Sequence, residues 1–295
     1  MQSNRPNVFL GLPEQFSDRR RAKYVIVPVP YDATVCFLTG TARGPEAILN
    51  VSPQMEWLDE ETRREIHLSG IATDDPIEPA RSPEEQMQRV RERIDSWIAQ
   101  GRFPIMLGGE HSITFGAVDA MIDHHGPISV LQFDAHADLR NEYTGGRFSH
   151  ASVMRRILER TDSIVQVGIR SFSPEEAREC APRIDRLIPP QVVRHDLKAA
   201  IGDIVQRLDQ KVYITIDMDA FDPAVAPGVG TPEPGGLDYR EVLAILRAVI
   251  QAKTVVGADV VETLPLGGNH IRTEFLAARL VGKLIAYLEE SNETT

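Results

Sequence analysis

Cysteine and long apolar runs are both scarce in this chain of 295 residues. The two cysteines, Cys36 and Cys180, form no CxxC pair, which argues against a disulfide framework and against a thiolate zinc site. The longest apolar runs, such as YVIVPVP (24–30) and TVVGADVV (254–261), are far shorter than the roughly 18 residues needed to cross a bilayer. We therefore expect no membrane partner, and we expect each cysteine to be a small packing residue.

A surplus of positive charge is missing as well. The 43 Asp and Glu outnumber the 32 Lys and Arg, giving a net charge of -11. A nucleic-acid-binding protein is expected to carry a basic face, so nucleic acid is not an expected partner, whereas small cationic molecules would be attracted. Segment 1–15 has no basic stretch leading into an apolar one of the secretory type, and we expect a cytoplasmic protein.

Repeats, low-complexity tracts and flexible linkers are also lacking, so we expect one domain spanning residues 1–295. Apolar runs typical of strands alternate with segments of helical periodicity. This alternation predicts an α/β fold with a mainly parallel sheet and helices on both of its faces. The expected strands are 24–30, 103–107, 127–134, 163–169, 211–217 and 254–262, with weaker ones near 66–72 and 184–188.

Two expected helices have clear start signals. Segment 82–101 begins with Ser82 as the N-cap and Pro83 at the first helical position, and it closes with a glycine. Segment 237–252 has Asp238 followed three residues later by Glu241, a variant of the capping box. Both helices are expected to connect strands of the parallel sheet.

Acids and histidines follow four of the expected strands. The segments are GGEHS (108–112), DAHAD (134–138), DMDAFDP (217–223) and ETLPLGGNH (262–270). Ligands of parallel sheets bind at the carboxyl ends of the strands, and alternate residues of an extended chain share a face. Asp134, His136 and Asp138 can therefore converge, as can Asp217 and Asp219. DMD alone would be read equally well as a solvated turn, but several acids at one sheet edge would repel each other unless a cation lay among them.

The number of possible ligands indicates more than one ion. Two histidines and four aspartates exceed what one four-coordinate site requires, and they suit a pair of ions bridged by carboxylates. Such a carboxylate-rich set without thiolates favours Mn²⁺, with nickel, cobalt and zinc left open. The candidate ligands are His111, Asp134, His136, Asp138, Asp217 and Asp219.

Three of these motifs, GGEHS, DAHAD and TIDMDAFDP, resemble the signature motifs of the ureohydrolase superfamily, which contains arginase and agmatinase. The resemblance extends over nearly the whole chain. It implies a three-layer α/β/α fold with a central eight-stranded, mainly parallel sheet, two Mn²⁺ ions per subunit, and a homo-oligomer, either a trimer or a hexamer. It further implies that one ion is held by His111, Asp134, Asp138 and Asp217, and the other by Asp134, His136, Asp217 and Asp219, with Asp134 and Asp217 bridging.

The same resemblance suggests two residues that act on the substrate. His150 resembles the histidine that carries protons at the mouth of the site, and Glu262 resembles the glutamate that binds the guanidinium group. A histidine titrates near neutral pH and a carboxylate can pair with a planar guanidinium, so the chemistry suits both roles. Without a metal site nearby, His150 would be read as a helix-start residue and Glu262 as a strand-end acid. With Asp138, they are the expected catalytic residues.

The expected substrate is a guanidino compound other than arginine. In arginase an Asn follows the DxHxD motif and acids follow a GIRD-like segment, whereas this chain has Arg140, with Asn141 displaced by one place, and Ser171 and Ser173. These departures favour agmatine, hydrolysed to urea and putrescine. The alternatives are hydrolysis of N1-aminopropylagmatine to spermidine and urea, or another hydrolase of the guanidino-acid or arginase type. Asn141 and His270 are candidate substrate contacts, and for His270 a structural role is equally consistent with the sequence.

A protein of another class remains conceivable at this stage. A catalytically silent, metal-binding oligomer would be expected to have lost Glu262 or His150, and a single-metal deacetylase of the related fold would not need all six ligands. The chain has kept these residues. The sequence therefore favours the hydrolase.

Overall fold

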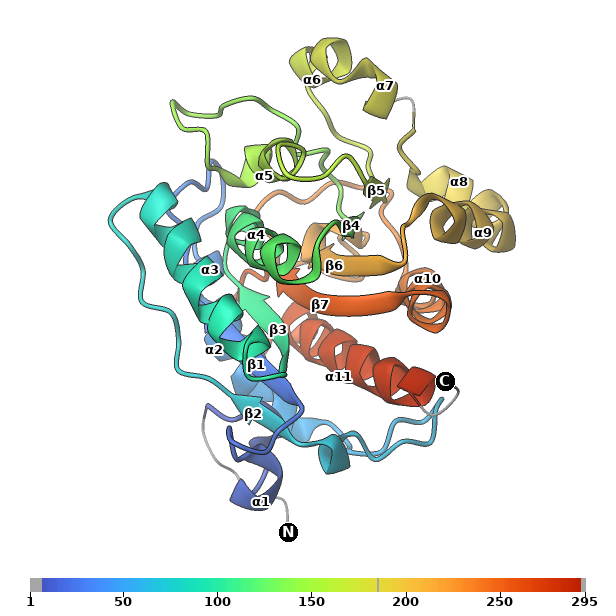
Figure 1. Cartoon of the computed structure of the whole chain (residues 1–295). Helices are drawn as coiled ribbons and strands as arrows, with labels where there is room; N and C mark the ends of the chain where they lie inside the picture. Colours follow the sequence, from blue (N-terminus) through green and yellow to red (C-terminus); the bar gives the residue numbers. More distant parts are fainter. Residues whose placement is uncertain (1–6, 185, 293–295) are drawn as a thin grey trace.

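The computed structural model describes residues 7–184 and 186–292. Its centre is a sheet of seven strands in the order β2-β1-β3-β7-β6-β4-β5, in which every pair of neighbours is parallel (Figure 1). The strands are β1 (Tyr24–Val29), β2 (Ile71–Thr73), β3 (Phe103–Gly108), β4 (Ser129–Phe133), β5 (Ile164–Val167), β6 (Lys211–Asp217) and β7 (Thr254–Val261).

Helices cover both faces of the sheet and complete the three-layer fold (Figure 1). One hydrophobic core lies under α3 (Pro83–Ile98), α4 (Thr114–His125) and α5 (Val153–Ile157). The other lies under α2 (Gly44–Val51), α9 (Leu197–Arg207), α10 (Tyr239–Ala252) and α11 (Arg272–Asn292). The shorter helices are α1 (Glu14–Ser17), α6 (Pro174–Glu179), α7 (Ala181–Ile184) and α8 (Pro190–His195).

Strand β1 shows why the expected strands are apolar at consecutive positions. Tyr24 and Ile26 belong to one core, while Val25 and Val27 belong to the other. Successive side chains of a strand point to opposite faces, and here each face is covered by helices, so both faces have to be apolar. The consecutive pattern thus follows from the three-layer arrangement.

The helix-start signals are confirmed. Ser82 Oγ accepts a hydrogen bond from Glu85 N at 3.2 Å at the start of α3. At the start of α10, Asp238 and Glu241 each accept a hydrogen bond from the other's backbone N–H at 2.8 Å. These bonds satisfy N–H groups that the first turn of a helix leaves without partners.

The expected eighth strand is wrong, because the described residues form a sheet of seven. Segment 66–72 contributes only β2, after a 3-10 helix at Ile66–Ser69. Among the described residues of segment 184–188, Ile188 forms one bridge with Val167, in which Gly168 N donates to Ile188 O at 2.8 Å and Ile188 N donates to Gln166 O at 3.1 Å. Pro189 and Pro190 follow at once, and a proline has no N–H with which to continue a ladder.

The strand order determines where the candidate ligands meet. Strands β3, β7, β6 and β4 are neighbours in the middle of the sheet, and all four run in the same direction. Their carboxyl ends therefore form one edge, to which the four polar motifs are delivered. Among the described residues, no helix combines the length and apolar character that crossing a bilayer requires.

Candidate metal centre

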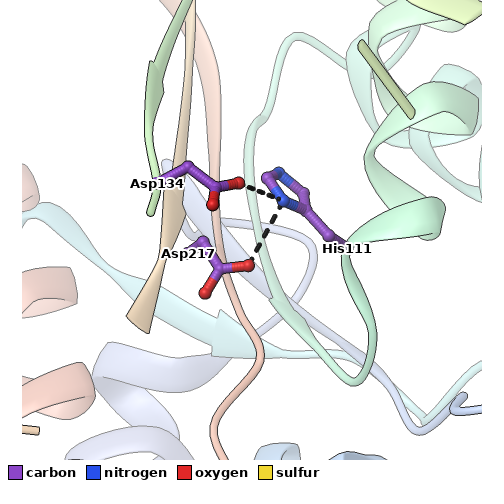
Figure 2. Close-up of side chains that lie close together, drawn as sticks. All are labelled: His111, Asp134 and Asp217. Atoms are coloured by element: carbon purple, nitrogen blue, oxygen red, sulfur yellow. Dashed lines mark ion pairs between the residues drawn. The ribbon is translucent and has the colours of Figure 1, made fainter. Parts of the chain in front are cut away.

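His111 faces three carboxylates at this edge of the sheet. It begins a 3-10 helix, His111–Ile113, shortly after β3. Its Nδ1 lies 2.9 Å from Asp134 Oδ2, 3.2 Å from Asp138 Oδ2 and 3.3 Å from Asp217 Oδ2. Figure 2 shows His111, Asp134 and Asp217 pointing toward one another from separate segments of the chain. The structure thus brings together the four side chains expected at one ion.

His136 forms a second cluster next to the first. Its Nδ1 lies 2.9 Å from Asp219 Oδ2 and 3.6 Å from Asp134 Oδ1. Asp134 therefore faces His136 with one oxygen and His111 with the other, and His111, Asp134 and Asp217 form one candidate ligand group while Asp134, His136 and Asp219 form another. Two ligand groups that share a carboxylate are the arrangement expected of a two-metal site.

Backbone N–H groups hold the carboxylates in place. His136 N donates to Asp134 Oδ1 at 2.5 Å, and Asp219 N donates to Asp217 Oδ1 at 2.8 Å. Ala135 N donates to Asp219 Oδ1 at 3.0 Å. Asp138 has a positive φ of 53°, a conformation that aspartate adopts more readily than most residues. These carboxylates are therefore oriented by the chain itself.

The imidazole of His111 has the features of a metal ligand. Its Nδ1 is buried and makes no hydrogen bond of acceptable geometry with a described residue, although three carboxylate oxygens lie close to it. Its Nε2 lies 2.9 Å from Thr215 Oγ1. A ligating histidine commonly forms such a hydrogen bond through its other nitrogen, which fixes the tautomer and the ring orientation. The residues present therefore fit a bound cation.

The excess of buried carboxylates in the cluster also favours binding of a cation. Burial raises the pKa of Asp217 well above its usual value, and the charges of Asp219 and Asp134 add to this effect. Burial and the charge of Asp134 raise the pKa of Asp138 to about 7. Burial opposes protonation of His111, yet the facing carboxylates raise the pKa of its imidazole well above the usual value. Divalent cations would compensate the same excess of negative charge.

Glu262 borders the cluster directly after β7. Its side chain is buried, its backbone has a positive φ of 60°, and its Oε1 accepts a hydrogen bond from His111 N at 2.8 Å. Burial raises the pKa of its carboxyl well above the usual value, and the charge of Glu110 acts in the same direction. A cationic group bound here would favour the carboxylate form.

His150 begins a short 3-10 helix, His150–Ser152. It is half-buried, and the Tyr143 ring meets it edge-on with 5.5 Å between the ring centroids. Burial lowers the pKa of His150 to about 4, with the positive charges of His136 and His111 as further causes. Its Nδ1 lies 3.2 Å from Thr34 Oγ1, a contact that the sequence motifs do not reveal.

A hollow of about 330 Å³ joins these groups, a volume that suits a small-molecule ligand. Its wall includes the histidines, three of the aspartates and Glu262 together with uncharged and aromatic side chains. These residues are Cys36, His111, His136, Ala137, Asp138, Arg140, Tyr143, His150, Ala151, Ser171, Phe172, Ser173, Pro174, Glu176, Asp217, Asp219, Thr231 and Glu262.

Two candidate substrate contacts lie elsewhere. Asn141 and His270 are not among the described residues that line the hollow. Asn141 is exposed, and its Oδ1 accepts a hydrogen bond from Arg156 Nη2 at 3.0 Å. His270 is exposed beside Leu266 and Ile271 in a separate surface depression. Tyr143 and Thr34 are instead the neighbours of His150.

Comparison with known proteins identifies the family. The sequence model of the Arginase family matches residues 22–286. The chain belongs to the arginase family. This family membership agrees with the fold described above, in which a parallel sheet carries the candidate ligands at one edge.

Arginase-family relatives are similar to this chain along most of their length. An N(1)-aminopropylagmatine ureohydrolase of Synechocystis is 38% identical over 302 residues, covering 97% of each chain. An agmatinase of Bacillus subtilis is 31% identical over 271 residues, covering 90% of this chain and 91% of the relative. Among solved structures, the agmatine ureohydrolase of Thermoplasma volcanium is 34% identical, with a TM-score of 0.85 over 94% of each chain.

Proposed function

We propose that this protein is a two-metal ureohydrolase that releases urea from a linear guanidino amine. The observation that carries the proposal is the pair of ligand groups sharing Asp134, with the buried carboxylate of Glu262 beside them. A carboxylate next to a dimetal site can bind a guanidinium group through charge-assisted hydrogen bonds. That combination suits hydrolysis at the guanidinium carbon better than a storage or structural role for the metals.

His111, Asp134, Asp138 and Asp217 would hold one ion, and Asp134, His136, Asp217 and Asp219 the other, with Mn²⁺ as the proposed metal. Ions in such a site activate water for attack near neutral pH. The oxygen-rich donor set is the basis for choosing Mn²⁺.

The side chains of the hollow supply binding and proton transfer. The alkylguanidinium and one water molecule give urea and an alkylammonium ion, so the water oxygen goes to urea and both water protons go to the departing nitrogen. Glu262 orients the guanidinium through Oε2, while Oε1 accepts the hydrogen bond from His111 N. Neutral His150, on the hollow wall, takes up one of the two water protons and gives it to the departing nitrogen as the carbon–nitrogen bond breaks and its electron pair moves to nitrogen.

The proposed substrate is N1-aminopropylagmatine, with spermidine as the second product, and agmatine is the second candidate. The N(1)-aminopropylagmatine ureohydrolase of Synechocystis is 38% identical to this chain, whereas the Bacillus subtilis agmatinase is 31% identical to it. The wall of the hollow carries Ser171 and Ser173 where arginase has acids that bind the amino acid head group. This composition supports a substrate that lacks the α-carboxylate of arginine.

Metal analysis combined with a urea-release assay tests the proposal. The purified protein, loaded with Mn²⁺, is assayed on N1-aminopropylagmatine, agmatine, arginine and 4-guanidinobutyrate. We expect two metal ions per chain and the highest kcat/KM for N1-aminopropylagmatine. Absence of urea from all four compounds with two metals bound would refute the ureohydrolase assignment, and a preference for agmatine would refute only the aminopropyl one. Light scattering of the same sample tests the proposed trimer or hexamer.

A further inference from the structure

Glu110, the third residue of the GGEHS motif, has no place in the proposed ligand set although its side chain is fully buried. Its carboxylate accepts three hydrogen bonds. Thr34 N donates to Oε2 at 2.6 Å, while Thr34 Oγ1 and Ser112 Oγ donate to Oε1 at 2.6 and 2.5 Å. Thr34 is thus bound to Glu110 through both its backbone and its hydroxyl group.

Close backbone packing brings these two residues together. Gly109 N donates to Val29 O at 2.9 Å, and Glu110 N donates to Tyr31 O at 2.7 Å. A Cβ atom at position 109 would lie 1.9 Å from Tyr31 O, so only glycine permits this approach. The segment after β1 is therefore fixed against the GGEHS motif, with Thr34 next to the Glu110 carboxylate.

Thr34 also contacts His150 at two points. His150 N donates to Thr34 Oγ1 at 3.1 Å, and His150 Nδ1 lies 3.2 Å from the same oxygen. The Tyr143 ring meets the imidazole edge-on. The ring of His150 is therefore held at Nδ1 by Thr34 and by the packing of Tyr143.

Thr34 Oγ1 can either donate a hydrogen bond to His150 Nδ1 or accept one from it, and the position of the hydroxyl hydrogen of Thr34 decides between the two. A threonine hydroxyl has a single hydrogen to donate, and two acceptors compete for it. Glu110 Oε1 lies 2.6 Å from the hydroxyl oxygen, whereas His150 Nδ1 lies 3.2 Å from it, so the shorter hydrogen bond is the one to Glu110. The hydroxyl hydrogen therefore points to Glu110, and Thr34 Oγ1 is left to accept a hydrogen bond from Nδ1–H of His150.

We infer that Thr34, held by Glu110, is a positioning residue that keeps the proton of neutral His150 on Nδ1 and leaves Nε2 to exchange protons with the substrate. The inference rests on the proposed function, in which His150 protonates the departing amine. Protonated His150 carries hydrogen on both ring nitrogens. When its Nε2 proton passes to the departing nitrogen, the Nδ1–H bond to Thr34 is unchanged, so no hydrogen bond near the ring has to be rearranged.

Two substitutions of Thr34 distinguish the contribution of its hydroxyl group from that of its methyl group. Thr34→Val keeps the shape and removes the acceptor, whereas Thr34→Ser keeps the acceptor. With the holoenzyme and its best substrate, we expect Thr34→Val to lower kcat by about tenfold or more, because general acid catalysis as a whole contributes about 10²–10⁴-fold. KM and metal content should stay as in the wild type, while the thermal midpoint should fall, because the buried Glu110 side chain loses a hydrogen bond. Thr34→Ser should restore kcat to within about twofold of the wild type.

Isotope-labelled histidine gives a second measurement that does not depend on turnover. In zinc-loaded protein at about pH 8, nitrogen chemical shifts report which ring nitrogen of neutral His150 carries the proton. The wild type should have it on Nδ1, and the His150 signal is assigned by its loss in His150→Asn. Thr34→Val should move the proton to Nε2.

Several results would overturn the inference. These are full kcat in Thr34→Val, a defect in Thr34→Ser as large as that in Thr34→Val, a change confined to KM, or a wild-type His150 protonated on Nε2. If instead the wild type released no urea from any guanidino compound, the proposed function would fall, and the chemical shifts would still decide whether Thr34 sets the tautomer.

Discussion

Glu262→Gln is the substitution that tests the proposed guanidinium contact most directly. Glu262 Oε1 accepts a hydrogen bond from His111 N at 2.8 Å, which a glutamine oxygen can also accept, so the fold of the strand end should survive. The other oxygen, Oε2, is the one left for the substrate. Glutamine would present an NH₂ group to the guanidinium there, in place of a charged acceptor.

The size of the effect follows from this geometry. One hydrogen bond to a charged group contributes about 1.5–3 kcal/mol, so its loss should lower kcat/KM by about 10- to 150-fold. The two metals should remain bound, because Glu262 is outside the proposed ligand set. Steady-state urea release and metal analysis on the same preparation measure both quantities.

Glu142→Gln is the matched control for Glu262→Gln. Glu142 is exposed in the segment between Arg140 and Tyr143, so its substitution changes the net charge equally without touching the proposed contact. It should alter kcat/KM by less than about threefold, because exposed charges are screened by salt. Equal losses in the two variants would show that the negative field of the protein, and not a contact with Glu262, attracts the substrate. Unchanged kcat/KM in Glu262→Gln would refute the assigned role.

The remaining predictions concern stability and metal binding. Lys283, only 1% exposed, lies 2.7 Å from the buried Asp59, and Lys283→Met should lower the free energy of unfolding by about 3–5 kcal/mol, as measured by urea denaturation. Lys23→Met removes an ion pair of similar length, 2.6 Å, between Lys23 Nζ and Glu289, but the Lys23 side chain is 44% exposed. This substitution should lower the free energy of unfolding by about 1 kcal/mol or less. Equal losses in Lys23→Met and Lys283→Met would contradict the argument that burial makes the Lys283 pair more important. Burial raises the pKa of Asp59, but hydrogen bonds from Lys283 and Thr62 outweigh it and hold the folded-state value below the ordinary one. The pairing should therefore stabilise the wild type above about pH 4 and be lost as the pH falls further, so the difference between wild type and Lys283→Met should shrink in unfolding curves below about pH 4. Adding Mn²⁺ at about 100 times the Kd of both sites should stabilise the wild type by about 2.7 kcal/mol per ion, or about 5 kcal/mol for two ions, but leave Asp134→Asn unchanged, and equal shifts in thermal scans would exclude Asp134 as a ligand.

The candidate ligands could be predicted from sequence because their pattern is local. Asp134, His136 and Asp138 alternate along one segment, and Asp217 and Asp219 repeat the spacing at the end of the neighbouring strand β6. The parallel arrangement, itself visible in the alternation of strand and helix, then places these segments at one edge. Their convergence in the structure agrees with that expectation.

The surroundings of His150 could not be predicted in the same way. Thr34 and Glu110 are 76 positions apart and meet only because β1 and β3 pair in one particular register. Asn141 is the opposite case. It lies three residues after the DAHAD motif in sequence, yet its side chain accepts a hydrogen bond from the buried Arg156 and does not line the hollow. Spacing within a loop does not determine the direction of a side chain. The aspartates converge because they lie at or just after the ends of neighbouring strands, although Asp138 has a positive φ and Asp219 lies in the 3-10 helix Met218–Ala220 and not in extended chain.

The apolar pattern at 184–188 was misleading because it carries no information about hydrogen-bonding capacity. Ile188 is buried as an edge-strand residue would be, and it does pair with Val167. The ladder nevertheless stops at the two prolines that follow. Reading the prolines together with the apolar run would have predicted the shorter sheet.

The distribution of the candidate ligands along the chain has a consequence for biosynthesis. They begin at His111 and end at Asp219. A ribosome adds about 5–20 residues per second, so a nascent chain spends several seconds with His111 and Asp134 made but their partners on β6 still missing. A complete set of ligands forms only after β6 has paired with β4. Binding of two metals by the full candidate set would therefore have to follow the synthesis of β6 and its pairing with β4.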